Sequence, residues 1–328
     1  MASRIVILAT GGTIAGQAPD ASRSLQYTSG VMGVEQLVAA VPGLADAADL
    51  TCEQIANIGS ENMSERVWLD LAAALNRYLA DPGMDGAVVL HGTDTMEETA
   101  YFLNLTVASF KPVVLTGAMR PANALSADGP VNILNAVQLA ASAEAAGKGV
   151  LVCLNGSIAA AREVTKTNTA DPATFKTPVF GELGYILDGK PAFCREPVRL
   201  RGADSEFSLD GITELPRVEI IYGHAGQRPD MIHAAVAAGA RGIVHAGVGM
   251  GRIHCDVLPA LVRAVENGVT VVCSTRVGSG PVLADGEMAG YGFVTADTLN
   301  PQKARVLLQL ALTKTGERDA VQKMFDTY

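Results

Sequence analysis

The sequence predicts an α/β protein built from two doubly wound parallel-sheet domains. Three observations support this prediction. Short apolar runs rich in β-branched residues alternate with longer amphipathic segments, several runs end in glycine-containing turns, and the alternation lapses once over a polar stretch before it resumes. Strand, loop, helix and strand at this spacing are typical of a parallel sheet covered by helices. We therefore expect a flavodoxin- or Rossmann-like N-terminal domain and a smaller α/β C-terminal domain.

The strands of the N-terminal domain are predicted from near-continuous apolar runs, as expected for strands that are buried on both faces. The first run, RIVILA at residues 4–9, leads into Thr10-Gly11-Gly12-Thr13. Further strands are expected on the same grounds at residues 51–57, 86–91, 112–116 and 149–154.

The helices between these strands are predicted from their start and stop signals. Pro42-Gly43 ends a short helix at residues 34–41. Asn62 followed by Glu65 predicts a capping box for a helix through residue 79, and Thr95 followed by Glu98 predicts a second box for the next helix. An alanine-rich helix is expected at residues 132–146.

The C-terminal domain is predicted to follow a polar linker. We expect an N-terminal domain at residues 1–195, a linker at 196–215 and a C-terminal domain at 216–328. Strands are expected at 217–222, 242–246 and 269–273. Pro229, Asp256 and Asn300-Pro301 are expected to begin helices, because proline suits the first helical turn and aspartate and asparagine suit the cap.

Composition argues against several classes of function. The net charge of −9 and the single tryptophan disfavour binding to nucleic acid or to an anionic membrane. Five scattered cysteines without a C-x-x-C pair are expected to be buried thiols rather than a disulfide framework. No apolar run is long enough for a transmembrane helix, and the chain enters a strand at once. This predicts a cytoplasmic protein, or a periplasmic or secreted one if an export signal has been removed.

The chemistry is expected in two loops that follow predicted strands, Thr10-Gly11-Gly12-Thr13 and His91-Gly92-Thr93-Asp94-Thr95. In open parallel sheets, ligands bind beyond the carboxyl ends of the strands. Glycine lets the backbone approach a ligand closely, and a threonine hydroxyl there can attack a carbonyl while neighbouring N–H groups stabilise the oxyanion. Each threonine taken alone is better explained as a turn or cap hydroxyl.

Cofactor and metal motifs are missing from the sequence. Threonine occupies the place of the middle glycine in Gly11-x-Thr13-x-x-Gly16, so the dinucleotide fingerprint fails, and the phosphate-binding loop and the H-E-x-x-H zinc motif do not occur. We expect neither a cofactor nor a metal. The histidines lack ligand spacing and are expected to be structural or surface residues, with His91 at most supporting its loop.

Several longer stretches together resemble one family, the bacterial-type L-asparaginases. The resemblance rests on ILATGGTIAG at residues 7–16 and HGTDTMEETAYFLNLT at 91–106, and it continues in GAMRP, SADGP, VTKTN and LNPQKARVLLQLALT. It covers the whole chain in order and is greatest to the type II branch, which includes the glutaminase-asparaginases. It implies hydrolysis of L-asparagine to L-aspartate and ammonia through an acyl-threonine ester, with L-glutamine as a second substrate.

The resemblance also implies roles for individual residues. Thr13 would be the nucleophile, polarised by Tyr27 on the same flexible loop and by Glu287 of a neighbouring subunit. Thr93, Asp94 and Lys166 would form a second cluster. The family assembles as homotetramers with each active site between the N-terminal domain of one subunit and the C-terminal domain of another. The residues expected to bind substrate are Gly59, Ser60, Glu61, Thr93, Asp94, Ala118 and Glu287.

Two positions depart from the common family pattern. Glutamate replaces a frequent glutamine at Glu61, which fits glutaminase activity. Arg252 stands where relatives carry asparagine or serine. A cation there would change the field around the substrate ammonium group, so we hypothesise that Arg252 tunes the ratio of asparagine to glutamine hydrolysis. A solvated or interface arginine is an equally good explanation.

Three alternative functions stay open at the level of sequence. A two-domain solute-binding protein would need no nucleophile. A nucleotide-dependent enzyme would use residues 11–16 as a phosphate cradle, which the missing glycine disfavours. A relative of the glutamyl-tRNA amidotransferases would need a basic surface for tRNA, which the acidic net charge disfavours.

Overall fold

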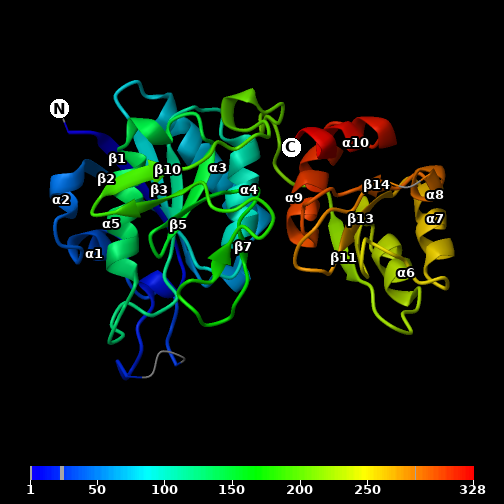
Figure 1. The fold of residues 1–328 in the computed structure, drawn as a ribbon, viewed down its shortest axis with the longest axis horizontal. Helices are drawn as coiled ribbons and strands as arrows, with labels where there is room; N and C mark the ends of the chain where they lie inside the picture. Colours follow the sequence, from blue (N-terminus) through cyan, green and yellow to red (C-terminus); the bar gives the residue numbers. More distant parts are fainter. Residues whose placement is uncertain (1, 23–25, 285) are drawn as a thin grey trace. The chain divides into compact units, whose positions relative to one another are not determined.

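The computed structural model describes residues 2–22, 26–284 and 286–328, apart from the side chain of Glu287. The chain divides into two compact units, Met1–Asp210 and Gly211–Tyr328. Each unit carries its own sheet (Figure 1) and its own buried core.

The N-terminal unit is built on a sheet of eight described strands. Five strands that follow one another across the sheet pair in parallel, which confirms the predicted parallel sheet. The other three pair antiparallel and extend one side of the sheet, which the sequence analysis did not predict. In sheet order the strands are β10 (Lys190–Phe193), β9 (Gly184–Leu187), β6 (Ser157–Ala160), β5 (Val150–Leu154), β4 (Val113–Thr116), β3 (Gly86–Leu90), β1 (Arg4–Gly11) and β2 (Asp49–Ile58).

Helices cover both faces of this sheet, as a sheet buried on both sides requires. Figure 1 shows α1, α2 and α5 on one face and α3 and α4 on the other. One core lies under α1, α2 and α5, where Ile7 and Val88 of the sheet pack with Leu37 and Ile133. The helices are α1 (Val34–Ala39), α2 (Leu44–Ala47), α3 (Glu65–Ala80), α4 (Met96–Thr106) and α5 (Gly129–Ala140).

Short elements complete this unit. Single 3-10 turns, η1 (Thr13–Ala15) and η2 (Ser60–Asn62), follow β1 and β2 directly. Two further turns are η3 (Ala143–Ala145) and η4 (Gly202–Asp204), and a small two-stranded sheet pairs β7 (Thr165–Lys166) with β8 (Phe175–Lys176).

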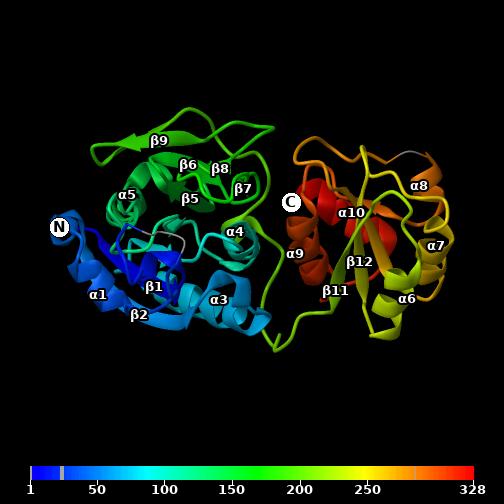
Figure 2. The same cartoon turned by 90° about the horizontal axis from the view of Figure 1, so that it is seen from below.

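The C-terminal unit has a parallel sheet of four described strands in the order β11 (Val218–Tyr222), β12 (Gly242–Gly247), β13 (Thr270–Thr275) and β14 (Val294–Thr295). Figure 2 shows helices on both of its faces. On one face α6 and α7 enclose a core that contains Ile221, Ile243 and Leu261, while α9 and α10 pack on the other. The helices are α6 (Asp230–Ala237), α7 (Leu258–Glu266), α8 (Gly286–Gly290), α9 (Pro301–Leu312) and α10 (Arg318–Thr327).

Several predicted helix boundaries were wrong by a few residues. Helix α3 is capped by Ser64, whose side chain accepts from the Val67 amide, rather than by Asn62. Helix α5 ends at Ala140, six residues before the predicted end. Helix α6 has Pro229 at its cap, and α7 begins two residues after Asp256. The cap at Asn300, with Pro301 as the first helical residue, is confirmed because the Asn300 side chain accepts from the Lys303 amide.

The cysteine prediction was half right. All five cysteines are free thiols, as expected. However, only Cys153 and Cys273 are buried, whereas Cys194 and Cys255 are exposed. The absence of a disulfide does not imply that a thiol is buried, because two cysteines too far apart to pair stay unpaired at the surface as well as in the core.

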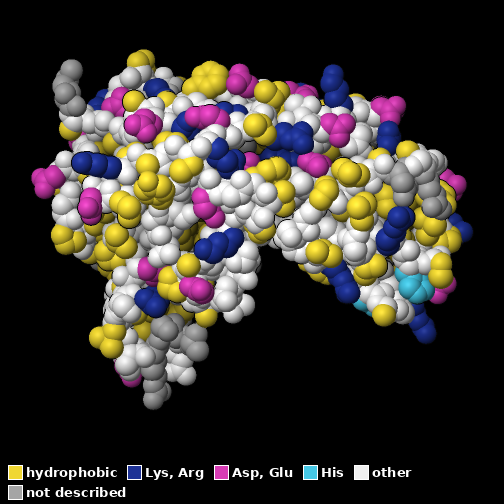
Figure 3. All heavy atoms as spheres, viewed as in Figure 1, with side chains coloured by type: hydrophobic (Ala, Val, Ile, Leu, Met, Phe, Trp, Pro, Cys, Tyr) yellow, Lys and Arg dark blue, Asp and Glu magenta, His cyan; other side chains and the backbone are white. Residues whose placement is uncertain are grey.

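Within the described ranges, none of the helices combines the length and the apolar character that crossing a bilayer requires. On the face seen in Figure 3, positive and negative side chains are interspersed rather than gathered into a continuous basic surface.

Candidate active site

The candidate site lies where three neighbouring parallel strands end. Strands β3, β1 and β2 are adjacent in the sheet, and their carboxyl ends lead into the segments that carry Thr93, Thr13 and Ser60. This is the edge of an open parallel sheet at which ligands bind. Residues that are up to 80 positions apart in the sequence are therefore brought to one place by strand order alone.

The loops after β1 and β3 touch through their glycines. Gly12 has φ +85°, and a Cβ atom added there would lie 2.3 Å from the Cα of Gly92. A Cβ on Gly92 would in turn lie 2.6 Å from the Ser60 hydroxyl oxygen. Side chains at either glycine would push these segments apart, so glycine is required for the close packing of the three strand ends.

Ser60 connects the end of β2 to the loop after β3. Its hydroxyl oxygen accepts from the Asp94 amide at 3.0 Å, and its carbonyl accepts from the Thr95 hydroxyl at 2.8 Å. Thr95 occupies the N-cap position of helix α4, as predicted, but the side-chain bond of the predicted capping box is not formed. Because the Ser60 hydroxyl oxygen accepts from the Asp94 amide, the hydroxyl hydrogen of Ser60 can donate to a ligand.

Thr13 and Tyr27 form one pair of hydroxyl groups. The Thr13 Oγ1 lies 2.7 Å from the Tyr27 hydroxyl, and the Thr13 residue is 8% exposed. The residue after Tyr27, Thr28, exchanges two backbone hydrogen bonds with Gln17, and these bonds hold Tyr27 in place. The Tyr27 ring packs against Gly16. The flexible loop predicted between Thr13 and Tyr27 includes residues 23–25, which lie outside the described residues.

Thr93, Asp94 and Lys166 form the second cluster. The ammonium group of Lys166, on β7, donates to Thr93 Oγ1 at 2.9 Å and to Asp94 Oδ1 at 2.7 Å (β7 is labelled in Figure 1). The Lys166 side chain is 16% exposed and the Asp94 side chain 61% exposed. Lys166 is thus largely withdrawn from solvent, while Asp94 keeps a carboxylate edge that a ligand can reach.

Two residues that the sequence analysis did not assign hold the loop after β4. The carboxylate of Asp128 accepts from the amides of Met119 and Arg120 at 2.9 and 3.0 Å, and Asn132 donates to the Gly117 carbonyl at 3.0 Å. These bonds fix the buried Ala118, which was predicted to line the site. The SADGP stretch was recognised as a motif, and its aspartate is the signal from which this positioning role could have been inferred.

His91 is a neutral support for the second loop. It is completely buried, its Nδ1 lies 2.6 Å from the Gly92 carbonyl, and its Nε2 has no partner among the described residues. Burial lowers the pKa of His91 to about 4, although the contact with Gly92 opposes the shift. The ring therefore donates through Nδ1 at neutral pH, which agrees with the expectation that His91 supports its loop.

The remaining predicted residues lie in different environments. Gly59 is buried, and a Cβ atom added there would lie 2.3 Å from Glu61 Oε1. Glu61 is itself exposed, and its Oε1 accepts from the Asn62 side chain at 3.1 Å. The side chain of Glu287 lies outside the described part of the structure, so its predicted role stays a prediction.

This arrangement can perform nucleophilic chemistry on a carbonyl compound. It offers two nearly buried threonine hydroxyls on abutting loops, each within hydrogen-bond distance of a group that can take or give a proton. A neutral alcohol needs such a neighbour to become a nucleophile.

Known proteins match the chain over nearly its whole length. A family model described as "Asparaginase, N-terminal" matches residues 4–199, and one described as "Glutaminase/Asparaginase C-terminal domain" matches residues 217–325. L-asparaginase 2 of Escherichia coli is 51% identical over 99% of this chain and 93% of its own length. Glutaminase-asparaginase of Pseudomonas fluorescens is 43% identical over 99% and 91%. The crystal structure of a probable cytoplasmic L-asparaginase from Campylobacter jejuni superposes with a TM-score of 0.98 at 46% identity, covering 99% of this chain and 100% of that one.

Proposed function

The chain belongs to the asparaginase family, in its bacterial type II-like branch, and from this premise we propose how it cleaves its substrate. The protein is an L-asparagine amidohydrolase, which converts L-asparagine and water to L-aspartate and ammonia. We propose that the reaction passes through a threonine ester and that L-glutamine is a second substrate, as the name of a glutaminase-asparaginase relative suggests.

Thr13 is the proposed nucleophile. Its hydroxyl attacks the side-chain amide carbon of asparagine, the carbon–nitrogen bond breaks, and ammonia leaves with a proton that comes from the hydroxyl. Water then attacks the ester and releases aspartate and the free threonine. The 2.7 Å contact with Tyr27 supports this assignment, because a polarising partner is already within hydrogen-bond distance of the attacking oxygen.

The second cluster is proposed to handle charge and protons. The Lys166 ammonium donates to Thr93 Oγ1, so the Thr93 hydrogen is left to point toward the substrate or the attacking water. The backbone N–H groups of Thr13 and Thr93 are proposed to stabilise the oxyanion. The close packing of Gly12 against Gly92 supports a single site that contains both threonines, because Thr13 directly follows Gly12 and Thr93 directly follows Gly92.

Substrate recognition is proposed to use opposite charges on the two ends of the amino acid. The α-carboxylate meets the Ser60 hydroxyl and amides near Gly59 and Thr93. The α-ammonium group meets Asp94 and Glu61, together with Glu287 of a neighbouring subunit, because carboxylates suit a partly buried cation. Ala118 lines the pocket for the side-chain amide. Asp94 still has one carboxylate oxygen that the described contacts leave for this purpose.

The assignment of Thr13 as the nucleophile rests on its contact with Tyr27. Measurement of ammonia release tests this assignment. Wild type, Thr13→Ala and the exposed-strand control Thr51→Ala should be compared on asparagine and glutamine. We expect Thr13→Ala to lose about 10³-fold or more in kcat while Thr51→Ala behaves as wild type. Turnover by folded Thr13→Ala within tenfold of wild type would refute the assignment.

Assembly with shared sites is a separate proposal, and subunit mixing tests it. Thr13→Ala and Glu287→Gln chains are each expected to be inactive. When they are mixed and reassembled at random, half of the pairs are mixed, and one of their two sites regains both residues. Roughly a quarter of the wild-type activity should therefore return. No recovery in a reassembled tetramer, or a sedimentation mass of one chain, would exclude sites built from two subunits.

The compartment is proposed to be the cytoplasm. Five free thiols, two of them exposed, suit a reducing compartment, and the Campylobacter relative is named as cytoplasmic. Release of the enzyme by osmotic shock, together with periplasmic markers, would contradict this proposal.

A further inference from the structure

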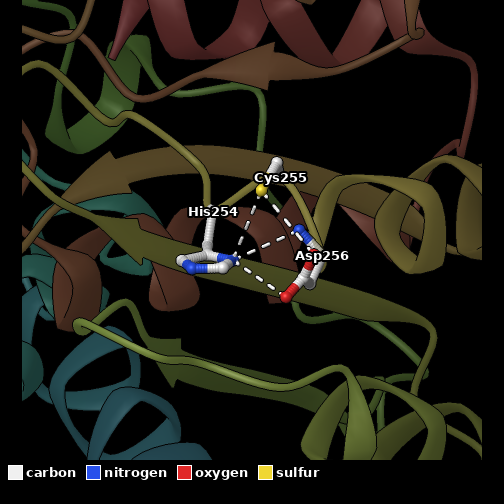
Figure 4. Close-up of side chains that lie close together, drawn as sticks. All are labelled: His254, Cys255 and Asp256. Atoms are coloured by element: carbon white, nitrogen blue, oxygen red, sulfur yellow. Dashed lines mark hydrogen bonds and ion pairs between the residues drawn. The ribbon is translucent and has the colours of Figure 1, made fainter.

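A second cluster of reactive side chains lies in the C-terminal unit, between β12 and α7. His254, Cys255 and Asp256 are consecutive in the sequence, yet Figure 4 shows their side chains turned toward one another. The Cys255 sulfur lies 3.9 Å from His254 Nδ1 and 3.6 Å from Asp256 Oδ1, and His254 Nδ1 lies 3.8 Å from Asp256 Oδ2. None of these residues belongs to the proposed hydrolytic machinery.

These distances are close to those of ligands around one tetrahedral ion. Zinc binds thiolate sulfur at about 2.3 Å and imidazole nitrogen or carboxylate oxygen at about 2.0–2.2 Å, which separates neighbouring ligand atoms by roughly 3.3–3.6 Å. The three potential ligand atoms all lie within 4.8 Å of one another. Small rotations of exposed side chains are enough to bring them to the required separations.

The backbone that carries the cluster is well anchored. The His254 carbonyl accepts from the amides of Val257 and Leu258 at 2.9 and 3.1 Å, which forms the turn that leads into α7. Val257 is completely buried in the core of this unit, and Ile253 packs against the same core. The three side chains therefore leave a short turn that is fixed at both ends, which reduces the entropy that a bound ion must overcome.

The histidine has its lone pair on the correct nitrogen. The Asp256 amide points at His254 Nδ1 at 3.2 Å, so in the neutral ring Nδ1 is the acceptor and Nε2 carries the hydrogen. An ion would take the place of this long amide contact. The His254 side chain is 32% exposed and that of Asp256 71% exposed, and Cys255 is exposed, so the cluster is open to an ion from solution.

We propose that His254, Cys255 and Asp256 bind a divalent transition-metal ion, with zinc as the best match and water in the fourth position. A thiolate and a carboxylate together balance the charge of a divalent ion, and the imidazole stays neutral. Thiolate and imidazole ligands select zinc or similar metals, whereas calcium and magnesium require oxygen ligands. This inference revises the expectation that His254 is a purely structural or surface residue.

Cobalt substitution tests the site directly. Untagged, metal-free protein should be titrated with Co²⁺, and the thiolate-to-cobalt charge-transfer absorption in the near ultraviolet should be followed. We expect this absorption to saturate at one ion per chain and to disappear when Zn²⁺ is added. Cys255→Ser should abolish it, and His254→Ala should weaken binding by about 10- to 100-fold.

The matched control is Cys194→Ser, which removes the other exposed thiol and lies in the N-terminal unit. It should keep the absorption unchanged, and asparagine turnover should show that each variant is folded. A thiol-labelling assay provides a second readout, because Zn²⁺ should protect one exposed thiol in wild type and in Cys194→Ser. Wild type without the absorption and without protection, or an absorption that persists in Cys255→Ser, would overturn the proposal.

Discussion

The contact between Gly12 and Gly92 makes a sharp prediction, because it joins the two loops that carry the threonines. An added Cβ at Gly12 would lie 2.3 Å from the Gly92 Cα, whereas ordinary van der Waals contact begins at 3.4 Å. Gly12→Ala must therefore move one loop away from the other by about 1 Å. No side-chain rotation can relieve this overlap, because the backbone fixes the position of the added Cβ and the atom that it meets is a backbone Cα.

A displacement of this size should affect catalysis more than folding. Misplacement of reacting groups by about 1 Å can cost roughly 100-fold in rate, so kcat for asparagine should fall by about two orders of magnitude. The φ of +85° with a ψ of −171° lies in a region that is essentially restricted to glycine, so alanine there adds strain of about 1–3 kcal/mol, which lowers the melting temperature but leaves the fold intact. Steady-state ammonia release and thermal unfolding measure the two effects separately.

Two glycines provide matched controls. Gly43→Ala also introduces backbone strain, in the left-handed helical region at φ +75° and ψ 2°, but nothing lies within 4 Å of the added Cβ, so stability should fall while kcat is retained. Gly33→Ala has an ordinary φ of −76° and also meets nothing within 4 Å, so both properties should be unchanged. A kcat for Gly12→Ala within twofold of wild type, or a loss of activity in Gly43→Ala as large as that in Gly12→Ala, would contradict this prediction.

Three further predictions follow from the same region. The buried His91, whose pKa is lowered to about 4, stays neutral in the native state, whereas in the unfolded chain it gains a proton below about pH 6.5. Its contribution to the free energy of unfolding therefore falls as the pH falls from about 6.5 toward 4, by about 2 kcal/mol at about pH 5. Denaturant unfolding of His91→Asn, which keeps a donor but does not titrate, should show a pH dependence smaller by that amount, and an equal dependence would contradict the assignment. Lys166→Met should reduce kcat by about 100- to 1,000-fold with little change in melting temperature, because its partner Asp94 remains solvated; a kcat near wild type would remove Lys166 from the mechanism. Asp128→Asn weakens the two charge-assisted bonds to the loop after β4 by about 1–3 kcal/mol, so thermal unfolding should detect a loss of stability and the KM for asparagine should rise, whereas unchanged values would show that the loop is held by other contacts.

The substrate ratio offers a test of Arg252 that rests on the sequence alone. If this cation tunes the field around the substrate ammonium group, Arg252→Ser should change the ratio of asparagine to glutamine kcat/KM. An unchanged ratio would leave Arg252 as a solvated or interface residue. In the structure, Arg252 and Val248 exchange two backbone hydrogen bonds, at 2.8 and 3.1 Å.

Local patterns in the sequence determined the elements and the two catalytic loops. The buried strands were predicted because continuous apolar runs ending in glycine have few other stable solutions, and β1 and β3 lie at the predicted places within two residues. The cap at Asn300 was also correct, since it depends only on the neighbouring residues. Recognition of the long motifs gave the family, which short-range physics could not.

Tertiary structure alone decided how these pieces meet. Thr95 has the spacing of a capping residue, yet its hydroxyl donates to Ser60, because the strand order places the ends of β2 and β3 on either side of β1. The antiparallel strands β6, β9 and β10, the roles of Asp128 and Asn132, and the convergence of His254, Cys255 and Asp256 likewise left no periodic signal. The physical reason is that periodicity reports which face of an element is buried. The partner of a loop side chain depends instead on which strands are neighbours and how a turn directs its side chains.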